Sequence, residues 1–264
     1  MKEFYIVASL FSILGFCNFD KNHHQAEKSY QTQRIISTQD NSLLYKTEQV
    51  HFPMNKENPN ESIQKKDSVM LNVVIITQNP ELKYGCEITS LAMVLNYAGV
   101  KTNKMELYQA IKKETDPLIK SQSGDIIKWG NPNEGFVGDM KGKQPGYAVF
   151  DQPIVQLINK YLPNRAVNLT NQPFENVLQH VSDGYPVVVW TTGDFRMPDR
   201  WEAWYHEQQI IKTPLDLHAV VLVGYDNEHV YVNDPLSGKK QVKINKSQFV
   251  NSWKALKCRA VSYK

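Results

Sequence analysis

The chain has few cysteines, little excess of charge of either sign and no long apolar run. Three cysteines in 264 residues are too few for a disulfide-stabilised scaffold. Lys and Arg number 30 against 27 Asp and Glu, and a net charge of +3 argues against a strongly basic nucleic-acid-binding protein. No apolar run reaches the length of a membrane span, which excludes a polytopic membrane protein. No cysteine pair has the close spacing of a zinc site, and no glycine-rich phosphate loop is present.

The N-terminus resembles an export signal. Residues 4–17 form a mostly apolar segment behind Lys2, and its length fits the core of a signal peptide better than a membrane span. Cys17 raises the alternative of a lipid anchor, although Phe16 stands where lipoprotein signals have a small residue. A first helix or strand of the fold is a further alternative, disfavoured by the polar sequence that follows. We predict a signal peptide or membrane anchor over 1–17, and a secreted or cell-surface protein.

A polar segment separates this N-terminus from the folded part. Residues 18–68 are rich in Asn, Gln, Lys, Ser, Glu and Thr, and their apolar residues follow neither helical nor strand periodicity. Such a stretch buries too little surface to offset its ordering entropy, so we predict a disordered linker. His23 and His24 lie in it and are interpreted as a solvated pair. Residues 69–264 are predicted to form one domain.

Within 69–264, helices are expected first and an antiparallel sheet later, which predicts an α+β fold. Over 86–98, Ile88, Leu91, Ala92 and Leu95 share one helical face, and Gly99 ends the helix. Further helices are expected at 103–112, with Asn103 as cap, 152–161 and 173–182. Strands are expected at 71–76, 186–191, 218–225, 229–233, 239–244 and 258–262, with long loops at 113–147 and 193–216.

Cys86 is the candidate nucleophile. It follows Gly85 at the first turn of a predicted helix, where unpaired N–H groups and the helix dipole favour a thiolate. Gly85 would let a second chain, such as a substrate, approach closely. Glu87 works modestly against the thiolate, and a buried structural cysteine is the alternative. Cys86 and Cys258 could pair in an oxidising compartment, but a disulfide would consume the nucleophile, so we expect none between them.

His218 and Asp234 are the candidate base and its orienting carboxylate. His218 opens the strand HAVVLVGY and Asp234 ends the strand VYVNDP, with a turn at Asp226-Asn227 between them. Antiparallel pairing across that turn would bring the two side chains together. Taken singly, a histidine at such a position is more often a structural residue than a base, and Asp234 could simply start the turn before Pro235.

The remaining candidates are weaker on local pattern. Gln78 precedes the turn at Asn79-Pro80 and could point its amide into an oxyanion hole beside the Cys86 backbone N–H, or simply be solvated. His180 and His229 read as structural or solvated residues. His206 lies among the aromatic residues of 193–216, where it could line a cleft or pack the loop itself.

Several ordered blocks of the chain resemble the bacteriocin-leader (double-glycine) peptidase-like family of the papain-like cysteine peptidases. They cover most of 71–253 and read QNPELKYGCEITSLAMVLNYAGV (78–100), WGNPNEGFVGD (129–139), PGYAVF (145–150), GYPVVVWTT (184–192), HAVVLVGYD (218–226) and VYVNDPLSG (230–238). The resemblance implies a papain-like fold, in which a helical part carrying the cysteine packs on a sheet carrying the histidine. It also implies a catalytic triad of Cys86, His218 and Asp234, with Gln78 completing the oxyanion hole.

The sequence therefore predicts a secreted or surface-tethered cysteine peptidase that acts on a peptide or protein substrate without a metal or organic cofactor. The leader peptidases are fused to a membrane transporter with an ATPase, and this chain carries neither, so it resembles a stand-alone, secreted branch. No nucleic-acid partner is expected. Any attachment to a membrane is expected only through the N-terminus. The alternatives are a cell-wall peptide amidase or acyltransferase that uses the same triad, and a binding module that has lost turnover.

Overall fold

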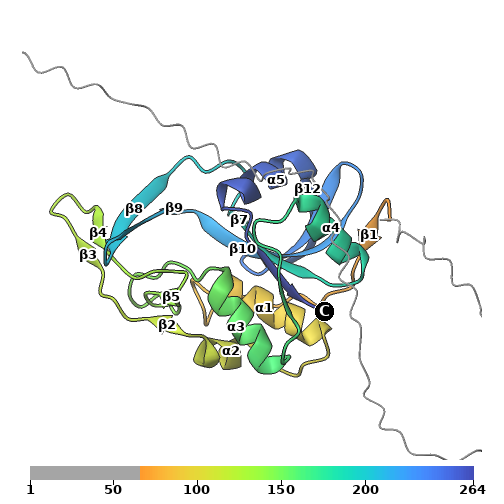
Figure 1. The fold of residues 1–264 in the computed structure, drawn as a ribbon, viewed down its shortest axis with the longest axis horizontal. Coiled ribbons are helices and arrows are strands. Elements are labelled where there is room, and N and C mark those ends of the chain that lie inside the picture. Colours follow the sequence, from red (N-terminus) through yellow and green to blue (C-terminus); the bar gives the residue numbers. More distant parts are fainter. Residues whose placement is uncertain (1–65) are drawn as a thin grey trace, which may run out of the picture. The chain divides into compact units, whose positions relative to one another are not determined.

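A seven-stranded antiparallel sheet forms the centre of the protein. The computed structural model describes residues 66–264, and Lys65–Lys264 form one compact unit. The strands follow the order β12-β11-β10-β7-β13-β6, and β1 pairs with β10 (Figure 1). Their bounds are β1 (Val69–Met70), β6 (Ala166–Asn168), β7 (Val187–Thr192), β10 (Leu217–Tyr225), β11 (His229–Asp234), β12 (Lys239–Asn245) and β13 (Ala260–Tyr263).

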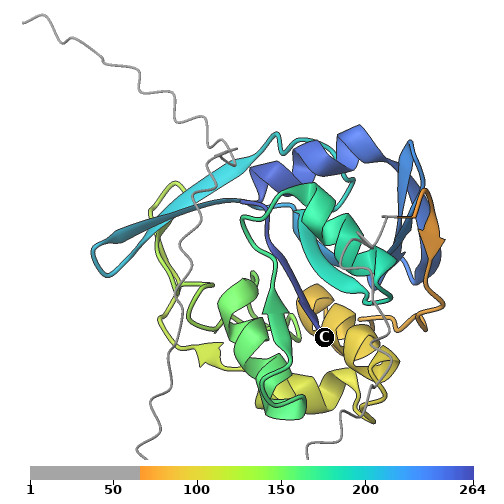
Figure 2. The ribbon, with the colours of Figure 1, turned by 45° about the vertical axis from the view of Figure 1, so that its right-hand side comes forward.

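Helices cover both faces of this sheet. Figures 1 and 2 show α1 to α3 on one side of it, and α4 and α5 on the other. All residues of β7 are buried, as expected for a central strand between two helical layers. The helices span α1 (Cys86–Tyr97), α2 (Lys104–Ala110), α3 (Asp151–Tyr161), α4 (Phe174–Ser182) and α5 (Lys246–Ala255). The predicted α+β class, with the Cys86 helix packed on the sheet that carries His218, is confirmed.

Helix α1 is buried along almost its whole length. Every residue from Cys86 to Leu95 is buried, including the polar residues Glu87, Thr89 and Ser90. The helix packs against the central strands β10 and β7. Burial on all sides is what an almost uncharged helical segment such as SLAMVL requires. It also places three polar side chains where each needs a hydrogen-bond partner.

The prediction of a loop at 193–216 is wrong. The segment forms the hairpin β8 (Trp201–His206) and β9 (Gln209–Pro214), which Figures 1 and 2 show projecting from the sheet. It joins β3 (Ile119–Lys120) and β4 (Ile126–Lys128) in a second sheet. Its stability comes from Trp204, which packs with Trp129, Val137 and Ile211 in a separate small core. These contacts are distant in sequence, so local patterns did not indicate them.

Other expectations needed smaller corrections. Residues 71–76 form no strand: Leu71 donates its backbone N–H to Val223, but the carbonyl of Val73 then accepts from the side chain of Asn233. The predicted loop 113–147 holds short strands, among them β2 (Lys113–Glu114) and β5 (Phe136–Val137). Helix α5 and strand β6 were not predicted. The Asn103 cap of α2 is confirmed, because its side chain accepts from the N–H groups of Met105 and Glu106.

The expectations for the N-terminal part cannot be compared with the fold. The predicted export signal, the predicted linker as far as residue 65 and the pair His23-His24 lie outside the described residues. Within residues 66–264, none of the helices has the length and apolar character needed to cross a membrane.

Candidate active site

Cys86 begins α1 beside the start of β10. Gly85 is the N-cap residue, so the Cys86 N–H belongs to the first turn, where amides lack a partner within the helix. One turn along, the Ser90 hydroxyl donates to the carbonyl of Ala219 at 3.2 Å. The backbone amide of Ala219 in turn interacts with the Cys86 sulfur. Because Ala219 follows His218 directly, these contacts hold the sulfur close to the backbone that carries the histidine.

His218 and Asp234 meet near the ends of the paired strands β10 and β11, where Val221 lies opposite Asn233. Nε2 of His218 lies 2.8 Å from Oδ1 of Asp234, and both side chains are almost fully buried. The same oxygen accepts the Leu236 N–H at 2.9 Å, while Oδ2 accepts the Ser237 hydroxyl. The carboxylate is thus held from both sides by the turn that follows β11. With Nε2 engaged, Nδ1 is the ring nitrogen that remains to exchange a proton with a thiol.

The pKa of Asp234 reflects these contacts. Burial on its own would raise it, but the hydrogen bond and charge of His218, together with the bonds from Ser237 and Leu236, lower the pKa to about 2. Asp234 is therefore ionised throughout the neutral range. A permanent carboxylate at this position can orient the imidazole and stabilise it in its protonated form.

The Cys86 thiol bonds to its neighbour in sequence. Within the described residues, Sγ donates to Oε2 of Glu87 at 3.4 Å rather than to His218. Burial, followed by the charge of Glu87, raises the pKa of Cys86 well above its usual value. Burial and Glu87 thus act against the thiolate that the helix terminus is expected to favour. In this conformation the resting side chain is a neutral thiol.

Glu87 is the site residue whose importance the sequence did not reveal. Its Oε1 accepts the backbone N–H of Val149 at 3.0 Å while Oε2 faces the Cys86 sulfur, and the side chain is fully buried. Burial raises the pKa of Glu87 to about 7. The signal that could have pointed to it is its place next to Cys86, as the only charged residue of α1.

Gln78 is buried close to the other candidates. Its exposed fraction is 3%, its Nε2 donates to the Lys83 carbonyl at 2.8 Å, and its Oε1 is buried with no hydrogen-bond partner among residues 66–264. Its backbone N–H donates to the carbonyl of Pro235, the residue after Asp234. Nε2 has a second hydrogen, so its bond to Lys83 still leaves one donor for a ligand.

Two further expectations concern Gly85 and Cys258. A Cβ on Gly85 would lie 2.5 Å from the Cβ of Leu82, so the space beside Gly85 is taken by this chain itself and not kept for a substrate. No disulfide joins Cys86 to Cys258, and both are buried, which confirms that expectation.

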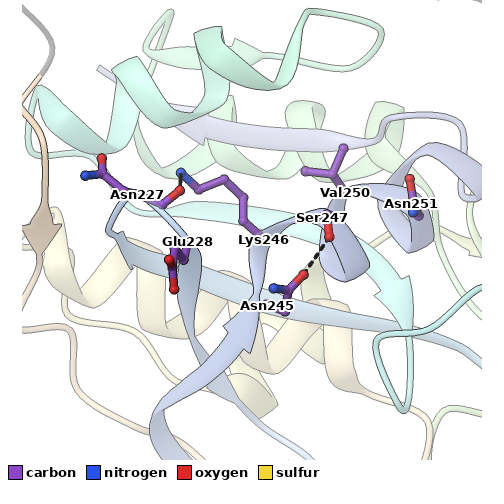
Figure 3. Close-up of a pocket in the computed structure, with 7 residues that line it drawn as sticks. All are labelled: Asn227, Glu228, Asn245, Lys246, Ser247, Val250 and Asn251. Atoms are coloured by element: carbon purple, nitrogen blue, oxygen red, sulfur yellow. Dashed lines mark hydrogen bonds between the residues drawn. The ribbon is translucent and has the colours of Figure 1, made fainter.

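A surface pocket of about 680 Å³ lies at the opposite end of the β10–β11 hairpin from His218 and Asp234. Figure 3 shows side chains around it from the turn after β10 and from the start of α5. Lys246 donates to the Asn227 carbonyl and Ser247 to Asn245. Of the described residues, neither a cysteine nor a histidine lines the pocket, and the candidate catalytic residues lie elsewhere.

The other predicted histidines lie elsewhere. Nε2 of His180 donates to the Tyr263 carbonyl, and the ring stacks on Tyr185. His229 contacts Asp226 at the turn between β10 and β11. Both are structural contacts, as expected.

Several known proteins are similar to this chain in sequence or in structure. The chain is 39% identical over 193 residues to the protein YvpB of Bacillus subtilis, a match that covers 72% of this chain and 74% of YvpB. A crystal structure from Bacillus anthracis, described as a C39-like peptidase, is 41% identical with a TM-score of 0.69, and covers 75% of this chain and 98% of that one. The Carica candamarcensis cysteine protease CMS1MS2 also matches, at 13% identity and a TM-score of 0.36, over 75% of this chain and 99% of its own.

A family model describes the same region. The model of the peptidase C39 like family matches residues 70–261, which is nearly all of the described chain and includes Gln78, Cys86, His218 and Asp234. The chain therefore belongs to the peptidase C39 like family.

Proposed function

We propose that this protein is a cysteine peptidase that hydrolyses an amide bond through Cys86, His218 and Asp234. The observation that carries the proposal is the buried His218–Asp234 pair, 2.8 Å apart, in which His218 lies on β10, a strand packed against the helix that begins at Cys86. A base held by a carboxylate beside a thiol is the arrangement that nucleophilic catalysis needs. Membership of the family supports the same chemistry.

The reaction begins from a neutral thiol. Nδ1 of His218 takes the Cys86 proton as the sulfur attacks the substrate carbonyl carbon, and Asp234 stabilises the imidazolium that forms. The Cys86 N–H and the Gln78 amide donate to the oxyanion. The imidazolium then protonates the leaving amine, which leaves a thioester. Water, deprotonated by His218, attacks the thioester and releases the carboxylic acid and the free thiol.

We further propose that the protein is exported and acts on a peptide or protein outside the cytoplasm. The support is the apolar segment 4–17 behind Lys2 and the polar stretch that follows it. The mass of the mature N-terminus, from protein recovered outside the cell, tests this. An N-terminus that still carries residues 4–17 in soluble cytoplasmic protein would contradict it.

The catalytic proposal is tested with an unbiased peptide library. We expect peptides cut by the native protein, identified by mass spectrometry, to stay intact with Cys86→Ala, while the circular dichroism of the variant is unchanged. Cys258→Ala is the matched control, because it removes the other buried thiol, and it should keep the same cleavage pattern. Cleavage by a folded Cys86→Ala protein would end the proposal.

A further inference from the structure

Three ligating side chains meet where the β8–β9 hairpin joins the rest of the domain. His206 comes from the end of β8, Glu114 from β2, and Glu134 from the turn before β5. Each offers one ligand atom, and these atoms lie within 4.8 Å of one another. They come from distant parts of the sequence, which is why no local motif indicated them.

His206 is buried there without a hydrogen bond. Its side chain is 7% exposed, Nε2 lies 3.3 Å from Oε1 of Glu134, and Nδ1 lies 3.5 Å from Oδ2 of Asp116. Nδ1 is fully buried and has no hydrogen-bond partner among residues 66–264. Buried polar atoms are nearly always hydrogen-bonded, but this imidazole lies between two carboxylates and bonds to neither, which leaves Nε2, on the side of Glu134, open to a ligand.

The surrounding chain fixes the two glutamates. Oε1 of Glu134 accepts from Nδ2 of the buried Asn131 at 2.9 Å. The Glu114 side chain lies against Gly130, where an added Cβ would approach its Cγ to 2.0 Å. The carbonyl of Gly130 accepts from Nε1 of Trp204 at 2.9 Å, which ties this segment to the strand that carries His206. The ligand atoms are therefore positioned by packing and hydrogen bonds of their own.

We propose that His206, Glu114 and Glu134 bind a divalent transition metal ion, with zinc the best match. Zinc takes imidazole nitrogen and carboxylate oxygen together at about 2.0–2.2 Å, and water can complete its shell. Calcium and magnesium prefer oxygen ligands alone, which makes the histidine unfavourable for them. Ligands at such bond lengths in a tetrahedron lie roughly 3.3 Å apart, and Nε2 of His206 lies 3.3 Å from Glu134.

Asp116 supports this assignment as a partner of the ligand. With Nε2 on the metal, Nδ1 of His206 would carry the proton and face Oδ2 of Asp116, 3.5 Å away, and Asp116 also contacts Lys128 at 3.4 Å. A carboxylate on the second imidazole nitrogen is the usual orienting contact of a metal-bound histidine. The ion would join β2, the turn at Glu134 and β8, and so fasten the hairpin to the domain. It takes no part in the chemistry proposed for Cys86.

The test uses the full chain with Cys86→Ala, which removes a competing zinc ligand and separates the result from the peptidase proposal. After dialysis against a chelator, zinc sulfate is titrated by calorimetry and thermal unfolding is followed with and without zinc. We expect a binding event that, at a hundredfold excess over its Kd, raises Tm by roughly 5–10 °C. His206→Gln and Glu134→Gln should each weaken it about tenfold or more.

His229→Gln is the matched control, because His229 also contacts a carboxylate, Asp226 at 3.2 Å, without further ligands. This variant should bind zinc with the same affinity as the Cys86→Ala protein in which it is made. Glu134→Gln guards against misfolding, since its side chain is 48% exposed. Equal zinc affinity in the parent and in a folded Glu134→Gln protein would overturn the proposal. The proposal would also be overturned if zinc did not change the Tm of the Cys86→Ala protein. That result is expected if His206 only forms ion pairs with its carboxylate neighbours.

Discussion

Glu87 places a titratable carboxyl group against the sulfur of Cys86. When Glu87 is ionised, its carboxylate accepts a hydrogen bond from the Cys86 thiol, and its negative charge disfavours ionisation of that thiol. When Glu87 is protonated, that opposition is removed, and the carboxyl can itself donate to the sulfur. With a pKa raised by burial to about 7, both forms occur near neutral pH. The residue is thus placed to influence when the nucleophile ionises.

Glu87→Gln should lower the pKa of Cys86. The amide oxygen can still accept the Val149 N–H, while the charge that opposes the thiolate is lost. The rate of iodoacetamide alkylation at Cys86, followed by peptide mass spectrometry against pH, should rise at lower pH than in the native protein. Glu106→Gln, an exposed glutamate of α2, is the control. Matching profiles for the native protein and Glu87→Gln would contradict this role.

Gln78 offers a test of the oxyanion hole. Gln78→Ala should lower kcat by roughly a hundredfold or more, because one donor to the developing charge is lost. Gln78→Glu should be at least as damaging, since a carboxylate would repel that charge. KM should change little, because the donor acts mainly in the transition state. Full turnover by Gln78→Ala would remove Gln78 from the mechanism and leave the roles of Cys86, His218 and Asp234 intact.

At the scale of elements, the contact between α1 and β10 determines the geometry of the site. Ser90 on the helix donates to the carbonyl of Ala219 on the strand. This bond lies one turn from Cys86 and one residue from His218. The proposed nucleophile and the proposed base are therefore aligned by a polar contact as well as by apolar packing.

Ser90→Ala should loosen this alignment. We expect the free energy of unfolding, from urea denaturation, to fall by about 1 kcal/mol, because a buried hydrogen bond is lost. Turnover should fall as well. Ser247→Ala is the control, since Ser247 bonds only to Asn245 at the exposed start of α5. Equal stability and turnover in the two variants would show that apolar packing alone sets the alignment.

Sequence patterns predicted the elements whose signals are local. The apolar face of α1, the Asn103 cap and the β-rich runs of β7, β10 and β11 were placed to within a few residues. The β8–β9 hairpin was not, because its buried residues contact Trp129 and Val137 from a distant segment. The contact between His218 and Asp234 could be predicted because a short turn joins their two strands. The contact between Glu87 and Val149 could not, because the two residues are far apart in the sequence and no local pattern links them.

At the scale of the whole molecule, Glu87 makes stability depend on pH. Its pKa rises from 4.5 to about 7 in the folded state, so the native protein holds this proton more tightly than the unfolded chain. The contribution is complete below pH 4.5 and is lost as the pH rises through about 7. It amounts to about 3 kcal/mol at most. Asp234, with its lowered pKa, acts in the opposite sense and only in more acidic solution.

We therefore expect the free energy of unfolding, measured in urea from pH 5 to pH 8, to decrease with pH more steeply in the native protein than in Glu87→Gln. The variant has no titratable group at that position, so the difference between the two curves isolates the carboxyl. Parallel curves would mean that Glu87 keeps its usual pKa in the folded protein.

The hydrogen bond between Ser90 and Ala219 joins residues 129 positions apart, so it can form only late in the synthesis of the chain. The ribosome makes the nucleophile long before it makes the histidine and aspartate that activate it. A growing or truncated chain carries an ordinary, unassisted thiol. Under the proposed function, hydrolytic capacity arises only once synthesis has passed Asp234 and the strands have closed on α1.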